Sequence, residues 1–188
     1  MGHVALFHSV YGLRPAVLAA ADRLRAAGHR VVAPDLYGVP PAETVDEGIA
    51  LLDKIGWEAV VERARAAVRD LPDDVVLLGF SMGAGVAGAM LRERPAAAGL
   101  VLLHAASGAP DGVRPGLPVH VHLADPDPWE PPDEFDAWQR EMTTAGADLT
   151  VHRYPGVGHL YTDPDVPDYD GAAAECTWER VLAFLDRR

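Results

Sequence analysis

The stretch GFSMGAG, residues 79–85, places a serine between two glycines at a point where the character of the chain changes. The run VVLLGF (75–80) is almost continuously apolar, as a strand covered on both faces of a sheet must be. The stretch GVAGAMLRER (85–94) has the composition and spacing of a helix. Ser81 is therefore predicted to lie in a tight turn between a buried strand and a helix.

Strand-like and helix-like segments alternate along the whole chain, which predicts parallel strands joined by crossover helices. Its 188 residues suit one domain with a sizeable core, and neither an internal repeat nor a linker divides them. We predict a single α/β domain over residues 1–188, with a doubly wound, mostly parallel sheet of about six strands, helices on both faces and no lid domain. Strands are expected at 4–8, 31–36, 75–80, 99–105, 119–124 and 149–154, helices at 16–28, 58–71, 85–94, 134–146 and 173–188, and loops at 106–118 and 162–171.

The pattern Gly-any-Ser-any-Gly between a strand and a helix is typical of the nucleophile elbow of α/β-hydrolases. In such an elbow the serine adopts a strained backbone conformation, and the glycines remove side chains that would collide with the neighbouring strand and helix. Ligands of open α/β sheets bind beyond the carboxyl ends of the strands, where Ser81 is expected. The alternative is an ordinary turn, because a chain with 18 glycines can contain this pattern by chance.

A serine hydroxyl is a weak nucleophile, so it needs an adjacent base that is oriented by an acid. In α/β-hydrolases these residues follow the serine in the order Asp or Glu, then His. His159 lies in PGVGHLYTD, a glycine-rich loop after the last predicted strand, and is the candidate base. The loop after the fifth predicted strand offers two candidate acids, Asp125 and Asp127.

The overall charge and the cysteine content narrow the class of partner. A net charge of −12 argues against nucleic acid and anionic membranes, which both require positive patches. No apolar run approaches the roughly 18–20 residues that span a bilayer. Cys176 is the only cysteine, which excludes an internal disulfide and fits a reducing compartment. We expect a cytoplasmic protein that acts on a small molecule.

Two histidines on one predicted strand, His120 and His122, share a face and could be metal ligands. No third histidine, cysteine or carboxylate lies at a recognisable spacing from them. A metal site is therefore not expected.

Several longer motifs make the chain resemble the dienelactone hydrolase family over nearly its whole length. They are HSVYGLRP (8–15), APDLYG (33–38), GFSMGAG (79–85), ADPDPWEPPDEF (124–135), YPGVGHLYTD (154–163) and PDYDGAAAECTWERVLAFL (167–185). The resemblance implies hydrolysis of small cyclic or activated esters without a metal or an organic cofactor. It also favours Asp127 as the acid, because the DPW element matches the family's acid position.

The chain departs from the family pattern at two positions. The best-known members have a cysteine as the nucleophile, where this chain has Ser81. They also have a glutamate in the loop after the first strand, where this chain has Ser9. In the cysteine enzymes this glutamate helps to hold and release the thiol proton, so both changes are consistent with a serine that is deprotonated directly by His159.

The predicted function is hydrolysis of a small carboxylic ester or lactone through an acyl-serine intermediate. The expected catalytic residues are Ser81, Asp127 and His159, and the backbone N–H groups of Val10 and Met82 are expected, by position, to form the oxyanion hole. One alternative is an acyltransferase or thioesterase with the same triad. A second alternative, from another class, is a catalytically silent binding module.

Overall fold

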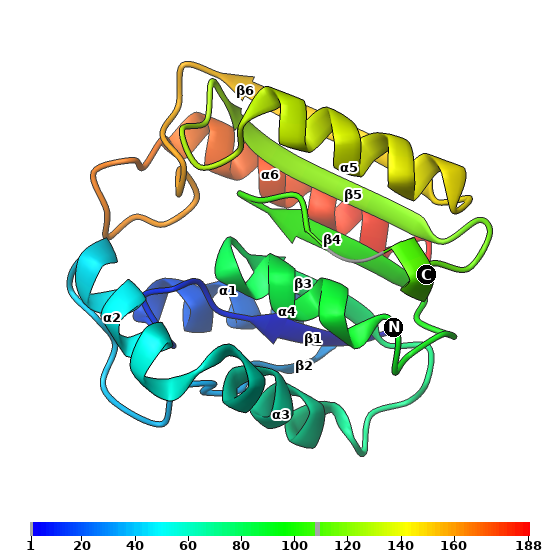
Figure 1. The fold of residues 1–188 in the computed structure, drawn as a ribbon, viewed down its shortest axis with the longest axis horizontal. Helices are drawn as coiled ribbons and strands as arrows, with labels where there is room; N and C mark the ends of the chain where they lie inside the picture. The colour runs from blue at the N-terminus through cyan, green and yellow to red at the C-terminus, as the bar shows by residue number, and fades with distance from the viewer. Residues whose placement is uncertain (1, 108–109) are drawn as a thin grey trace.

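The strands form one six-stranded sheet in the order β2-β1-β3-β4-β5-β6, and every neighbouring pair is parallel (Figure 1). This computed structural model describes residues 2–107 and 110–188. The chain proceeds outward from β1 to β2, returns to β3 on the other side of β1, and then continues to β6. The predicted doubly wound α/β class is confirmed. The strands are β1 (His3–Phe7), β2 (Arg30–Val32), β3 (Val76–Phe80), β4 (Gly99–Leu103), β5 (Pro118–Asp125) and β6 (Asp148–Pro155).

Helices cover both faces of the sheet (Figure 1). The helices α1 (Pro15–Ala26) and α6 (Gly171–Leu185) pack on one face, and the helices α3 (Trp57–Val68), α4 (Met82–Met90) and α5 (Pro132–Thr144) pack on the other. A further helix, α2 (Val45–Ile55), lies beside the carboxyl ends of the strands, on the left of Figure 1. The loop between β6 and α6 approaches α2 from the opposite side of this edge.

The central strand β3 illustrates how the sequence builds two cores. Every residue of β3 is buried. Because successive side chains of a strand point to opposite faces, Leu77 joins the cluster under α3, α4 and α5, whereas Leu78 joins the cluster under α1 and α6. The apolar run before Ser81 thus stabilises both layers and holds the end of β3 rigidly.

The second predicted strand is shorter than expected, because β2 ends at Val32 and the APDLYG motif forms a loop. The Asp35 carboxylate accepts hydrogen bonds from the backbone N–H groups of Tyr37 and Gly38, both at 2.9 Å. The N–H of Leu36 donates to His8 Nε2. These bonds occupy groups that a strand would need for pairing, so the motif ties the loop after β2 to the loop after β1.

The helix α2 was missed by the sequence analysis. Its start nevertheless has a recognisable signal, because Thr44 is the N-cap and its hydroxyl accepts a hydrogen bond from the backbone N–H of Glu47. Asp46 and Glu47 lie in the first turn and Lys54 in the last, which suits the helix dipole. Val45 and Leu51 pack against a small cluster that includes Tyr11. The helix therefore borders the loop that follows β1.

The remaining expectations concern loops and lids. Residues 108 and 109, in the loop predicted at 106–118, lie outside the described residues. No lid domain lies over the carboxyl edge of the sheet in the ranges that the structure describes. Within the same ranges, no helix is both long and apolar enough to span a membrane.

Candidate active site

Ser81 occupies a strained turn between β3 and α4. Its φ of 49° and ψ of −111° lie in a region that non-glycine residues rarely adopt. A Cβ atom on Gly79 would lie 1.9 Å from the carbonyl oxygen of Gly83, and one on Gly83 would lie 2.2 Å from the carbonyl oxygen of Phe7. Both glycines of the motif are therefore required by close backbone packing, and the turn has the geometry of a nucleophile elbow.

The structure brings Ser81, His159 and Asp127 together from three different loops. The Oγ atom of Ser81 lies 2.9 Å from Nε2 of His159, and Nδ1 of His159 lies 2.8 Å from Oδ2 of Asp127. The side chains of His159 and Asp127 are only 11% and 2% exposed. Little water therefore competes for these two contacts, and the imidazole is held between a hydroxyl and a carboxylate.

The two candidate acids differ clearly in position. Asp125 is the last residue of β5 and is exposed, and its backbone carbonyl accepts a hydrogen bond from the N–H of Gly156. Asp127 lies two residues further along and points at His159. Its second carboxylate oxygen, Oδ1, accepts a hydrogen bond from the backbone N–H of Trp129 at 2.9 Å. Both oxygens of Asp127 are thus engaged, which fixes its orientation.

The loop that carries His159 is anchored through the three residues that follow the histidine. The N–H of Leu160 donates to Oδ2 of Asp168 at 3.0 Å, and the hydroxyl of Tyr161 lies 2.9 Å from Oγ1 of Thr177 on α6. The next residue, Thr162, has its Oγ1 2.7 Å from Nε2 of the buried His104. A glycine-rich loop of this kind would otherwise be mobile, so these contacts place the imidazole relative to Ser81.

The two predicted oxyanion donors, Val10 and Met82, line the same cleft as Ser81 and His159. Met82 is the first residue of α4, where backbone N–H groups have no partner within the helix. In the described ranges, neither amide donates to a protein acceptor. His8 fixes the loop that carries Val10, because its Nε2 accepts from the N–H of Leu36 at 3.0 Å.

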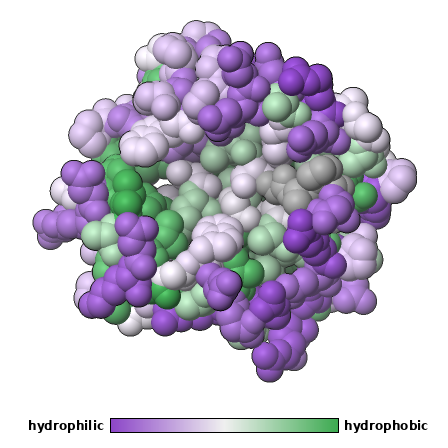
Figure 2. Space-filling model, in the orientation of Figure 1, coloured by the Kyte–Doolittle hydropathy of each residue, from purple (hydrophilic) through white to green (hydrophobic). Residues whose placement is uncertain are grey.

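A cleft of about 470 Å³ opens at Ser81 and His159. Its walls are mainly apolar and come from α2, from the loop after β5 and from the loop after β6. Figure 2 shows apolar side chains gathered around a hollow at the left of the view, which is this edge of the sheet. The apolar lining residues include Val45, Ile49, Leu52, Trp129 and Val166. The cleft can hold a small molecule with an apolar group beside the Ser81 hydroxyl.

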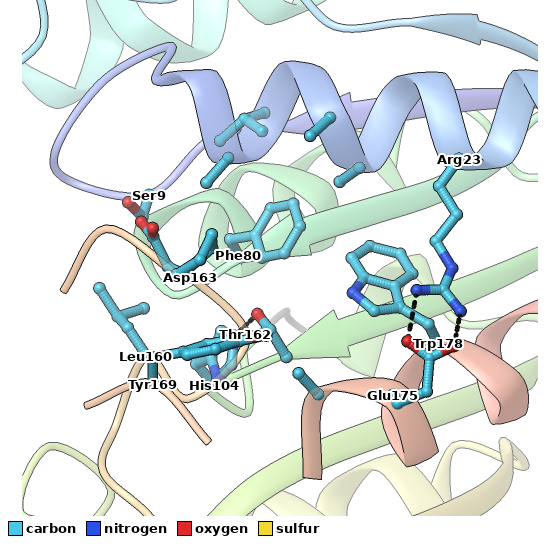
Figure 3. Close-up of a pocket in the computed structure, with 16 residues that line it drawn as sticks. Ser9, Arg23, Phe80, His104, Leu160, Thr162, Asp163, Tyr169, Glu175 and Trp178 are labelled. Atoms are coloured by element: carbon cyan, nitrogen blue, oxygen red, sulfur yellow. Dashed lines mark hydrogen bonds and ion pairs between the residues drawn. The ribbon is translucent and has the colours of Figure 1, made fainter. Parts of the chain in front are cut away.

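A second cavity of about 210 Å³ lies between α1 and α6 (Figure 3). The rings of Phe80 and Trp178 face it, and the ion pair between Arg23 of α1 and Glu175 of α6 lies beside them. Neither Ser81 nor His159 lines this cavity. The reactive hydroxyl therefore opens into the larger cleft.

Two residues of the loop after β5, which carries Asp127, have roles that were not predicted from the sequence. The ring of Trp129 lies 6.1 Å from the imidazole of His159 and covers one side of the cleft. The carboxylate of Glu130 accepts a hydrogen bond from the N–H of Ala106, and burial raises the pKa of Glu130. Glu130 thus ties the loop after β5 to the loop after β4. Both residues lie within three positions after Asp127, and this proximity was the available signal.

Spacing along the sequence was not a sufficient guide to the histidines that lie near one another. The register of β5 and β6 pairs His122 with His152, so a third histidine lies beside His120 and His122. One ring nitrogen from each of the three lies within 4.8 Å of the others. Spacing along the sequence did not reveal this cluster, because its third member comes from a different strand.

A strained serine between a buried strand and a helix, in a doubly wound parallel sheet, defines the class of α/β-hydrolases. Residues 2–188 match the family model of the dienelactone hydrolase family, and the chain belongs to this family. The resemblance seen in the sequence motifs is thereby confirmed, and the protein is a hydrolase that acts on esters. No protein of curated function matches the sequence.

Solved structures with the same fold share little sequence with the chain. One is a dienelactone hydrolase-like promiscuous phosphotriesterase, P91, from metagenomic libraries, with 21% identity and a TM-score of 0.77 over 99% of this chain and 86% of that chain. Another, m3DLH, has 20% identity and a TM-score of 0.83 over 99% and 86%. A third, from work on the metagenome-derived lipolytic enzymes LipS and LipT, has 16% identity and a TM-score of 0.72 over 99% and 94%. At these identities the likeness shows the fold alone.

Proposed function

We propose that this protein is a serine hydrolase that cleaves small carboxylic esters or lactones through an acyl-serine intermediate. The observation that carries the proposal is the pair of short contacts from His159, at 2.9 Å to Ser81 Oγ and at 2.8 Å to Asp127 Oδ2. These are the distances over which a nucleophile, its base and the base's orienting acid act.

In the first half of the reaction, Ser81 Oγ attacks the carbonyl carbon of the ester while its proton moves to Nε2 of His159. Asp127 accepts the Nδ1–H of His159, which keeps the reactive tautomer in place and stabilises the imidazolium that forms. The negative charge develops on the former carbonyl oxygen. We assign the N–H groups of Val10 and Met82, which line the same cleft, as the donors to this oxygen, and a donor of this kind typically lowers the barrier by about 3 kcal/mol.

In the second half, the tetrahedral intermediate collapses and its C–O bond to the leaving group breaks. The imidazolium of His159 donates its proton to the leaving alcohol, which departs, or stays attached to the acyl group if the substrate was a lactone. Water then attacks the acyl-serine with His159 again as the base. Release of the carboxylic acid restores the proton to Ser81.

The substrate class follows from the cleft rather than from the triad. A cleft of about 470 Å³ with Ile49 and Trp129 in its walls suits a compact substrate with an apolar group. The partner of this protein is thus a small molecule. Because Cys176 is free, a reducing cytoplasmic location remains our proposal.

A substrate panel tests the proposal. The purified protein should hydrolyse short p-nitrophenyl esters and small lactones, and a Ser81→Ala variant that keeps the native circular dichroism spectrum should not. Faster turnover of thioesters, or acyl transfer to an added alcohol in preference to water, would instead indicate a thioesterase or an acyltransferase. An inactive wild-type protein across all of these substrates would contradict the proposal.

A further inference from the structure

Three histidines form a cluster on the α6 face of the sheet, outside the cleft that contains Ser81. His120 and His122 lie two residues apart on β5, and His152 pairs with His122 across the β5–β6 register. Their ring centroids lie 4.6 Å apart for His122 and His152, 5.2 Å for His120 and His152, and 6.0 Å for His120 and His122. The ring of Phe184 on α6 packs against His120, with the two ring centroids 4.5 Å apart. Two strands and one helix thus meet at three imidazole rings.

Each of these rings has a buried nitrogen without a hydrogen-bond partner among the described residues. The three atoms are Nδ1 of His120, Nε2 of His122 and Nε2 of His152. A buried polar atom without a partner is rare, and each example needs an explanation. Three such atoms lie in one cluster, and one ring nitrogen from each histidine lies within 4.8 Å of the others, so the three rings can share one partner. The lone pairs of these nitrogens can bind a cation, but they cannot donate a hydrogen bond to an acceptor.

His122 already has the outer hydrogen-bond partner that metal-binding histidines usually have. Its Nδ1 lies 3.0 Å from the hydroxyl oxygen of Tyr154, which also accepts a hydrogen bond from Arg180 Nη1 at 3.1 Å. When Nδ1 of His122 carries the hydrogen and donates it to Tyr154, the lone pair of Nε2 is free. Such an outer partner fixes the tautomer and the ring orientation of a ligand histidine.

The protonation state of the three histidines favours the binding of a cation, whereas the charges near them oppose it. Burial lowers the pKa of all three histidines, that of His120 to about 4, so the rings are neutral at pH 7 and can act as ligands. Arg180 lies near His122 and His152, and Arg187 and Arg188 lie near His120, where Asp148 is the opposing negative charge. These arginines weaken the binding of a cation, so we expect moderate rather than very tight affinity.

We propose that His120, His122 and His152 bind one divalent transition-metal ion, of the class of zinc, with solvent as the fourth ligand. Three imidazole nitrogens suit zinc, copper, nickel and iron better than they suit magnesium or calcium. Ligand nitrogens on a tetrahedral zinc ion lie about 3.4 Å apart. Small rotations of the two partly buried rings, those of His120 and His152, can close the present separation.

The ion joins the edge strand β6 to β5 beneath α6, and it takes no part in the cleavage of the ester. None of the three histidines lines the cleft that contains Ser81 and His159. Binding should therefore raise thermal stability, because an ion that binds only the folded state stabilises it. Ester hydrolysis should not require the ion.

Titration of the chelator-treated full-length protein with Zn²⁺ and with Co²⁺ tests this proposal. Calorimetry should give one ion per chain, and Co²⁺ should give the visible absorption of a tetrahedral site with nitrogen ligands. His152→Gln and His120→Gln, which replace the two partly buried ligands, should each lower the affinity by at least about tenfold, since loss of an outer partner alone typically costs about that much. His159→Gln and His3→Gln are matched controls and should bind as the wild type does.

The thermal midpoint provides a second readout that does not depend on catalysis. Added Zn²⁺ should raise the midpoint of the wild type and of His159→Gln, but not that of His152→Gln. No saturable binding by the wild type, or binding that His152→Gln and His120→Gln leave unchanged, would overturn the proposal. Loss of binding in His159→Gln would assign the ion to the catalytic cleft and overturn it as well.

Discussion

Ser81 Oγ and His159 Nε2 lie 2.9 Å apart although 78 residues separate them in the sequence. Ser81 is held by the elbow between β3 and α4, and His159 by a loop whose next residues are bonded to Asp168 and to α6. The contact therefore depends on two independent parts of the fold. It is the basis of the mechanism proposed above.

The first prediction distinguishes the two candidate acids, Asp125 and Asp127. Asp127→Asn should lower kcat by about 10³- to 10⁴-fold, because an amide at this position favours the wrong tautomer of His159. Asp125→Asn is the matched control and should cost less than about tenfold, since its side chain is exposed at the end of β5. Steady-state kinetics on one p-nitrophenyl ester, with folded protein, measures both. The reverse order would transfer the role of the acid to Asp125.

The second prediction concerns the identity of the nucleophile. Ser81→Cys should be poorly active, because no carboxylate is present at Ser9 to manage the thiol proton. The Ser9 hydroxyl instead accepts from the N–H of Tyr11, and Ser9 lines the cavity between α1 and α6. The kcat/KM of the variant and its rate of alkylation by iodoacetamide should both be low at pH 7. Robust turnover would show that the lack of a carboxylate at residue 9 does not decide whether serine or cysteine is the nucleophile.

The third prediction tests the cleft as the site of the acyl group. Ile49 on α2 lines the cleft and is 38% exposed. Ile49→Asp should reduce kcat/KM for a hexanoate ester more than for an acetate ester, because only the longer chain reaches this wall. Leu18→Asp introduces the same change on α1, at a position that is 44% exposed and outside the cleft, and should leave both values unchanged. Equal losses for both esters in Ile49→Asp would place the acyl group elsewhere.

The fourth prediction links a buried histidine to acid stability. Burial lowers the pKa of His8, and its Nε2 must stay unprotonated to accept from the N–H of Leu36. In the unfolded chain the pKa of His8 is about 6.5. Below this pH the unfolded state therefore binds a proton at His8, whereas the folded state leaves His8 neutral. The free energy of unfolding should therefore fall as pH falls from about 7 to about 5.

Urea unfolding at several pH values measures this contribution. His8→Gln should show a shallower loss of stability between pH 7 and pH 5 than the wild type does. Other buried histidines retain their own share of the pH dependence, so the difference between the two curves isolates His8. Identical slopes for both proteins would contradict the assignment.

The sequence predicted those features that depend on local patterns. Strand β3, the elbow at Ser81 and the helix α4 were all predicted because apolar runs, glycines and helical spacing are visible within a few residues. The helix α2 was missed although its signals are local too: Thr44 and Glu47 carry a capping signal, and the apolar residues of 45–55 recur at helical spacing.

Features that depend on contacts between distant segments were beyond the sequence. Nothing in the spacing of residues indicates that His152 pairs with His122, because this requires the register of β5 and β6. The residues alone left Asp125 and Asp127 open as well. To choose between the two aspartates one must know the direction in which the chain turns after β5. In the structure only Asp127 points at His159.

The central claim is that Ser81 is the nucleophile, and reaction with a fluorophosphonate probe tests it most directly. Intact-mass measurement should show one adduct per chain, and peptide mapping should place it on Ser81. Labelling should disappear in Ser81→Ala and become much slower in His159→Gln, with both variants folded. Labelling that persists in Ser81→Ala, or a wild-type protein that does not react, would contradict the claim.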